Sequence, residues 1–192
     1  MEKTLYENTK KTASNRGRIT WITRTAVLLA LLIVMQAATA PLANTIVTGS
    51  LVNLILIVSV MISGLSSGFT IAVCSPALAK LFGIGPLWSI LPFVALGNAS
   101  LVFVWHLIGN RKFGNQLLVS IITLITAAIT KFVVLYIGVV KIALPVLLAL
   151  PEPQTKVISN MFSVPQLFTA GIGGIIAALI LPKLKKVVSK DL

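Results

Sequence analysis

Long apolar stretches alternate along this chain with short polar or Gly/Pro-rich segments. The apolar runs have the length of membrane-crossing helices, and they lack the residue-by-residue alternation of outer-membrane strands. The pattern therefore predicts an all-α integral membrane protein built as a six-transmembrane-helix bundle. The predicted spans are residues 25–44, 50–65, 69–82, 90–109, 115–137 and 160–182.

The segments between the spans differ in character. "SGLSSG" (63–68) predicts a tight turn, and "GIGPLW" (83–88) predicts a loop, because Gly and Pro interrupt regular structure. The prolines at 145, 151 and 153 predict a long loop before the last span.

Composition agrees with a membrane location. Of the 192 residues, 57% are hydrophobic and 10% are charged, and the mean hydropathy is +1.01. The net charge of +12 does not predict nucleic-acid binding, because the basic residues cluster at the chain ends and in one loop rather than in a stripe with interleaved aromatics. Cys74 is the single cysteine, which excludes a disulfide or a cysteine zinc site within one chain. We expect no metal and no cofactor.

The positions of lysines and arginines predict the orientation in the membrane. With a cytoplasmic N-terminus, twelve of them fall on the cytoplasmic side and three on the outside, as the positive-inside rule requires. Both termini are then cytoplasmic, and the third and fifth loops face outward. The twelve are Lys3, Lys10, Lys11, Arg16, Arg18, Arg24, Arg111, Lys112, Lys183, Lys185, Lys186 and Lys190. The three are Lys80, Lys141 and Lys156.

The organisation that follows has three parts. Residues 1–24 form a basic cytoplasmic segment, residues 25–185 the six-helix membrane domain, and residues 186–192 a cytoplasmic tail. "ATA" (38–40) resembles a signal-peptide cleavage site, but Pro41 would follow the cut. We interpret 25–44 as a retained first helix.

Lys131 is the one charged residue in the apolar run 124–140, which overlaps the fifth predicted span. It lies about 16 residues from the cytoplasmic end of its helix, hence about 25 Å up the membrane. An ammonium facing lipid there costs several kcal/mol, so Lys131 must face the bundle interior or a cavity, or extend to the outer interface. The chain has four acidic residues, and Glu152 is the only one on the same side. Two interpretations stay open: a structural role such as a contact to Glu152, and a contact to a ligand.

Other polar and aromatic side chains are expected at the same level. A few polar groups converging with aromatics are typical of a small-molecule site, although each residue alone also suits a structural role. The candidate substrate-binding residues are Lys131, Asn98, Trp88, Tyr136, Asn160 and Gln166.

Small residues predict where helices approach closely. Ala26 and Ala30 form an AxxxA pattern in the first span, which could serve a partner protein. Ala170, Gly174 and Ala178 repeat at the same spacing in the last span, where internal packing is the simpler explanation.

Taken over residues 25–185, the chain resembles the substrate-binding S components of energy-coupling factor (ECF) vitamin transporters. The resemblance rests on six short spans, Ala26 and Ala30, a Gly/Pro/Trp loop before "LPFVALGNASLVFVW" (91–105), and "FSVPQLFTAGIGG" (162–174).

The resemblance implies a bacterial plasma-membrane protein that binds a vitamin from outside, between the outer ends of the fourth to sixth helices and the first, third and fifth loops. It also implies a transmembrane coupling subunit docked on Ala26 and Ala30, two cytoplasmic ATPase subunits, and release by reorientation. The chain has no GxxxxGK[ST] phosphate loop, so ATP hydrolysis would belong to the partners. The identity of the vitamin stays open. Lys131 suits an anion such as pantothenate, whereas the overall resemblance of the sequence favours family members that handle pyridoxine or hydroxymethylpyrimidine.

Two other function classes remain as alternatives. "GLSSG" (64–68) matches G-x-S-x-G, so Ser66 with His106 could form an intramembrane serine hydrolase, although that motif normally joins a strand to a helix. An autonomous secondary transporter or channel is the second; carriers of this kind usually place carboxylates in the membrane, and no predicted span has one. A purely structural membrane protein is the remaining possibility.

Overall fold

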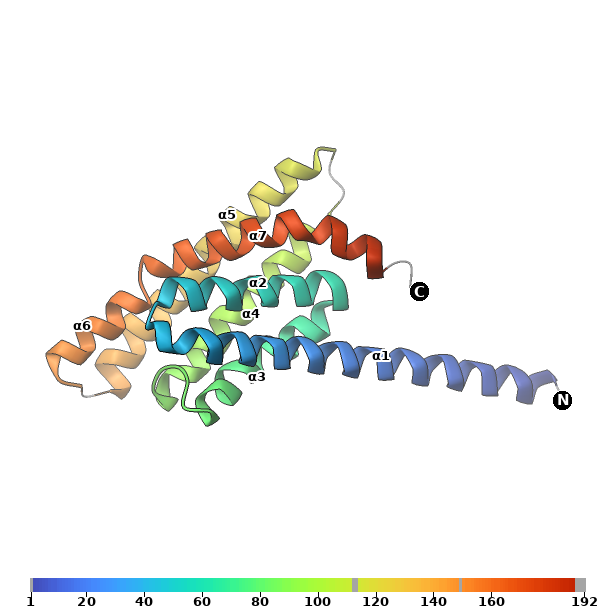
Figure 1. The fold of residues 1–192 in the computed structure, drawn as a ribbon, viewed down its shortest axis with the longest axis horizontal. Helices are drawn as coiled ribbons and strands as arrows, with labels where there is room; N and C mark the ends of the chain where they lie inside the picture. The colour runs from blue at the N-terminus through green and yellow to red at the C-terminus, as the bar shows by residue number, and fades with distance from the viewer. Residues whose placement is uncertain (1, 112–113, 149, 189–192) are drawn as a thin grey trace.

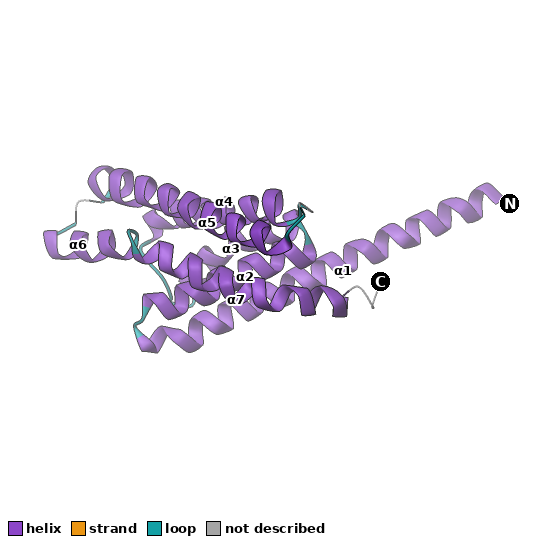
Figure 2. Ribbon diagram, turned by 90° about the horizontal axis from the view of Figure 1, so that it is seen from above, coloured by secondary structure: helices purple, strands orange, loops and turns teal. Residues whose placement is uncertain are grey.

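A computed structural model of the chain describes residues 2–111, 114–148 and 150–188; of residues 2–14 and 16 it describes the backbone only. These residues form helices joined by short connections, with no strand among them (Figures 1 and 2). The α-helices are α1 (Glu2–Thr39), α2 (Thr45–Ser63), α3 (Leu65–Leu81), α4 (Leu91–Gly109), α5 (Gln116–Leu135), α6 (Glu152–Met161) and α7 (Pro165–Val188). The short 3₁₀ helices are η1 (Ala40–Leu42) and η2 (Trp88–Ile90), and η3 (Tyr136–Leu147) is a π-helix.

Helical segments of membrane-spanning length confirm that this is an all-helical protein suited to a bilayer. Within the described ranges, five segments are long and apolar enough to cross a membrane. They are Gly17–Leu42, Thr45–Ser63, Trp88–Gly109, Gln116–Leu147 and Glu152–Val188. The predicted third span, residues 69–82, corresponds to α3, which is a shorter apolar helix of 17 residues.

The prediction of a long loop containing Pro145, Pro151 and Pro153 is wrong. The π-helix η3 continues α5 without a break and contains Pro145, and α6 follows after four residues. Pro151 is the N-cap of α6 and Pro153 lies in its first turn, where a missing N–H breaks no helical hydrogen bond. These prolines therefore begin a helix, although we interpreted them as interrupting one.

The first two helices also differ from the prediction at their ends. Helix α1 begins at Glu2 rather than near residue 25, and its first half projects beyond the bundle (Figure 1). The turn predicted over 63–68 is a single residue, Gly64, between α2 and α3. Gly64 has φ +86°, a conformation that glycine adopts without strain.

Helix α2 lies at the centre of the bundle and packs against α1, α3, α4 and α7. Its buried side chains include Leu56, Ile57 and Val60, which join the main apolar core. Helix α7 approaches α2 closely at Gly173, where a Cβ atom would lie 2.6 Å from the backbone oxygen of Ser50. The absence of a side chain at Gly173 is what permits this spacing.

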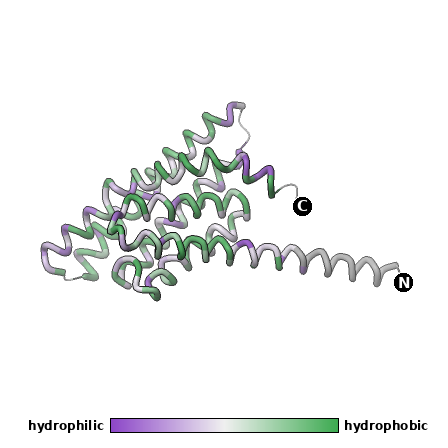
Figure 3. Tube along the Cα trace, viewed as in Figure 1, coloured by the Kyte–Doolittle hydropathy of each residue, from purple (hydrophilic) through white to green (hydrophobic). Residues whose placement is uncertain are grey.

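Different parts of the chain lie at the two ends of the bundle. The first residues of α1 and the last residues of α7 lie at one end, whereas α6 and the α1–α2 and α3–α4 connections lie at the other (Figures 1 and 2). Apolar residues dominate the middle of the bundle, and hydrophilic residues gather at the end of α7 (Figure 3).

Candidate functional site

A cavity of about 870 Å³ lies at the end of the bundle away from the chain termini. Residues from α1 to α7 line it, together with the α1–α2 and α3–α4 connections. Exposed residues such as Asn44 and Gly85 form part of its wall, so the cavity reaches the protein surface. The side chains with polar groups that line it are Gln36, Asn44, Thr45, Thr48, Asn53, Ser75, Lys80, Asn98, Lys131 and Gln166.

Lys131 of α5 supplies a buried ammonium group to this cavity. The residue is only 4% exposed. Its Nζ donates hydrogen bonds to Oδ1 of Asn53 on α2, at 2.5 Å, and to Oδ1 of Asn98 on α4, at 2.8 Å. An ammonium has three N–H donors, so one remains for a ligand or water in the cavity.

A chain of hydrogen bonds fixes the side chain of Asn53. Asn53 Nδ2 donates to Thr169 Oγ1 at 3.2 Å, and Thr169 Oγ1 donates to the backbone oxygen of Gln166 at 3.1 Å. The network thereby connects α2, α4, α5 and α7. Gly49 permits the approach of α2 to Thr169, since a Cβ on Gly49 would lie 2.8 Å from Thr169 Cγ2. Because both Asn53 and Thr169 are buried, their amide and hydroxyl groups hold defined positions.

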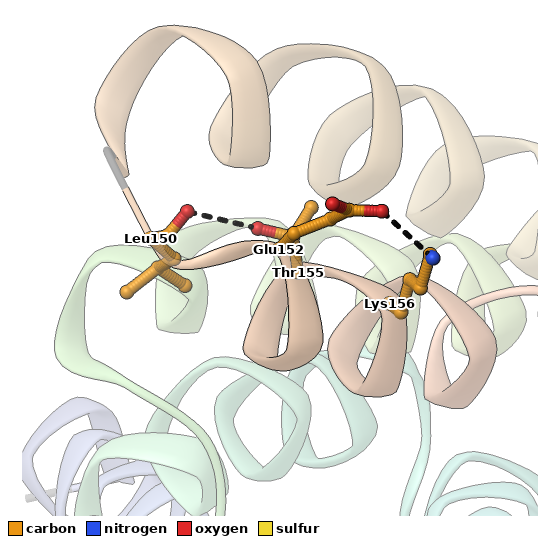
Figure 4. A network of polar contacts seen from close by, with 4 residues as sticks. All are labelled: Leu150, Glu152, Thr155 and Lys156. Atoms are coloured by element: carbon orange, nitrogen blue, oxygen red, sulfur yellow. Dashed lines mark hydrogen bonds and ion pairs between the residues drawn. The ribbon is translucent and has the colours of Figure 1, made fainter.

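The contact considered between Lys131 and Glu152 is not formed. Glu152 pairs with Lys156 at 2.7 Å along α6, on the surface, where both side chains are more than 70% exposed (Figure 4). Beside this pair, Thr155 Oγ1 donates to the backbone oxygen of Leu150 at 3.4 Å. The described partners of Lys131 are thus two neutral amide oxygens.

Three of the six candidate substrate-binding residues come together: Lys131, Asn98 and Gln166 all line the cavity. The Nε2 group of Gln166 also donates to the backbone oxygen of Met161 at 2.9 Å, which holds the α6–α7 turn. These three therefore form a cluster contributed by α4, α5 and α7.

The other three candidates lie elsewhere. Trp88 is 56% exposed and does not line the cavity. Tyr136 stacks on Phe132 with ring centroids 5.7 Å apart, and Lys141 Nζ lies 5.7 Å from its centroid. Asn160 lines an adjoining, smaller hollow of about 400 Å³, which shares Asn44 and Met161 with the cavity.

Sequence reasoning missed seven of the ten polar residues of the cavity, and three of the seven illustrate why. Asn53 was overlooked, although an asparagine within an apolar span is a signal that could have been used. Gln36, an amide within the first predicted span, was also overlooked. Its Oε1 atom is buried without a hydrogen-bond partner. Lys80 was interpreted only as an outward-facing charge.

The serine and histidine of the hydrolase alternative do not meet. Ser66 Oγ accepts a hydrogen bond from Trp21 Nε1 at 3.0 Å, and His106 Nδ1 is buried without a partner. A catalytic pair requires a serine–histidine hydrogen bond, and none joins these two residues. Over the described part of the chain, no group of three or more His, Cys, Asp or Glu residues is placed to hold a metal ion.

The small residues of α1 face outward. Ala26 and Ala30 are both exposed, and they lie beside exposed Val27, Leu31 and Val34 on the same helix. This apolar face is therefore available to lipid or to another protein.

Comparison with known proteins returns no relative: no protein-family model, curated protein or solved structure matches the chain.

Proposed function

We propose that this protein is the membrane-embedded substrate-binding subunit of an ATP-driven importer of the ECF type. It captures a water-soluble vitamin or vitamin precursor from outside a bacterial cell and releases it inside. The observation that carries the proposal is the cavity with buried Lys131, at the end of the bundle opposite to both termini. Its volume of about 870 Å³ is within the range of small-molecule sites.

The orientation follows from charge and topology together. Counting α3 as a short crossing would give six spans, and the proposal then places both termini in the cytoplasm. Twelve lysines and arginines then lie inside and three outside. In this orientation the cavity opens to the exterior, as an importer's capture site must.

Energy for release would come from partner subunits. The chain has no phosphate-binding loop of the GxxxxGK[ST] type. The exposed α1 face with Ala26 and Ala30 would dock a transmembrane coupling subunit, because small residues permit close helix contact. Two cytoplasmic ATPase subunits would then drive reorientation of the protein and release of the ligand.

The proposal is tested by native mass spectrometry of gently purified protein. We expect a single small molecule, bound in a one-to-one ratio and lost on unfolding. Uptake in proteoliposomes should require the ATPase subunits. Uptake by the isolated protein would instead support an autonomous transporter, and a protein that binds no vitamin or precursor would contradict the proposal.

The orientation is tested separately by cysteine labelling. With Cys74→Ala as background, a cysteine at Ser89 should react with a membrane-impermeant thiol reagent added to intact cells. A cysteine at Asn110 should react only after the cells are opened. Both residues are exposed and lie at opposite ends of α4 and its preceding turn. The reverse labelling pattern would place the cavity on the cytoplasmic side.

A further inference from the structure

The charge of the cavity wall narrows the class of ligand that the cavity can accept. Two lysines, Lys80 and Lys131, line the cavity, and none of the described residues that line it is acidic. The only acidic residue between positions 8 and 190 is Glu152, which pairs with Lys156 on the surface. No described carboxylate is therefore placed to pair with either lysine.

The surroundings of Lys131 are incomplete without an anion. Its two partners are neutral oxygens of Asn53 and Asn98, which satisfy two N–H donors but supply no compensating charge. A buried charge is strongly disfavoured unless it is paired as well as hydrogen-bonded. An anionic group at the third donor would supply the missing charge.

We propose that the ligand is a small carboxylic acid that binds as a monoanion. Its carboxylate contacts Lys131 Nζ. Of the two lysines only Lys131 is fully buried, and one buried ammonium compensates one charge, which favours a carboxylate over a phosphate ester with nearly two charges. This inference rests on the proposed function and deepens it, since it favours acids such as pantothenate over neutral or cationic vitamins.

The test measures equilibrium binding of defined compounds to the full chain in lipid nanodiscs. Matched pairs differ only in a carboxylate: pantothenate against pantothenol, and 4-pyridoxate against pyridoxine. Biotin, nicotinate, riboflavin, hydroxymethylpyrimidine and thiamine complete the panel. We expect a carboxylate to bind most tightly. One of the two matched pairs will bind more tightly than the other. Within that pair, the alcohol should bind at least about 30-fold more weakly than the carboxylate, as expected when one partner of a buried charge pair is removed.

Each outcome separates the two proposals. A neutral or cationic compound as the tightest ligand would overturn the carboxylate inference and leave the proposed function standing. Binding of none of the panel would overturn both. Equal binding within the matched pairs would also overturn the inference.

Variants test the contact to Lys131. Lys131→Gln should weaken binding of the carboxylate at least about 30-fold and hardly change binding of the matched alcohol. Lys141→Gln is the control, because Lys141 is exposed and does not line the cavity. If Lys131→Gln fails to fold, Lys80→Gln is the second variant. No hydrogen bond joins Lys80 to Lys131, Asn53 or Asn98, so this change leaves the hydrogen bonds of Lys131 intact. It should weaken carboxylate binding a few-fold and reduce its salt dependence. Unchanged binding in the variants that fold would refute the proposal.

Discussion

A single methyl group at Gly173 should destabilise the bundle, because α7 lies directly against the backbone of α2 there. A Cβ on Gly173 would lie 2.6 Å from Ser50 O, 2.8 Å from Asn53 Cβ and 2.9 Å from Leu54 N. Two of these three atoms belong to the backbone and cannot rotate away. The helices must therefore separate, and overpacking of this kind costs about 1–3 kcal/mol.

Gly171 provides a matched control in the same helix. A Cβ there would have no heavy atom within 4 Å. Because alanine favours a helix over glycine by about 0.5–1 kcal/mol, Gly171→Ala should stabilise the protein slightly. The same gain applies to Gly173→Ala, so the free energies of unfolding of the two variants should differ by the overpacking cost alone, about 1–3 kcal/mol.

The assay compares thermal unfolding of the two purified variants with the wild type in the same detergent. Gly173→Ala should unfold at a lower temperature than the wild type, and Gly171→Ala at the same or a slightly higher temperature. Gly173→Ala should also weaken ligand binding, because separating α2 from α7 moves Asn53, which holds Lys131. If Gly173→Ala were as stable as Gly171→Ala, the close contact between α2 and α7 would be refuted.

Three further predictions concern single side chains. Asn53→Ala should lower the free energy of unfolding by about 1–3 kcal/mol, since it leaves Lys131 without one buried acceptor, as measured by denaturation. Lys156→Ala should change stability by less than about 0.5 kcal/mol, because its pair with Glu152 is exposed, and a larger loss would mean that α6 depends on this pair. Ser66→Ala should leave uptake in proteoliposomes unchanged, and loss of uptake with retained folding would revive the enzyme interpretation.

Hydropathy predicted the membrane helices well, because burying apolar side chains in lipid requires long apolar runs. It failed at 138–159, where prolines were interpreted as helix breakers. Pro151 and Pro153 instead occupy the start of α6, and Pro145 lies within η3, where the wider π-helical pattern replaces the α-helical one. Proline indicates that a hydrogen bond is missing, but it does not specify whether a helix ends or begins there.

Only part of the candidate site could be predicted from the sequence. Lys131 stood out because it is the one charge in a long apolar run, and its burial follows from the cost of exposing an ammonium to lipid. Asn53 and Gln36 did not stand out, since an amide in a span is common enough to suit ordinary helix packing. Trp88 and Tyr136 were expected in the site from their position along the chain, but only the tertiary packing determines which way such side chains point.

The unbroken helical path from α5 through η3, followed closely by α6, has a consequence for tolerance to insertions. A loop can gain a residue without moving what it connects, whereas one residue added within a helix turns every later residue of that helix. An insertion between 137 and 143 would thus turn buried Leu144 out of the apolar cluster that it forms with Ile90 and Phe162. Proteins that share this architecture should accordingly vary in side chains along this segment while conserving its length.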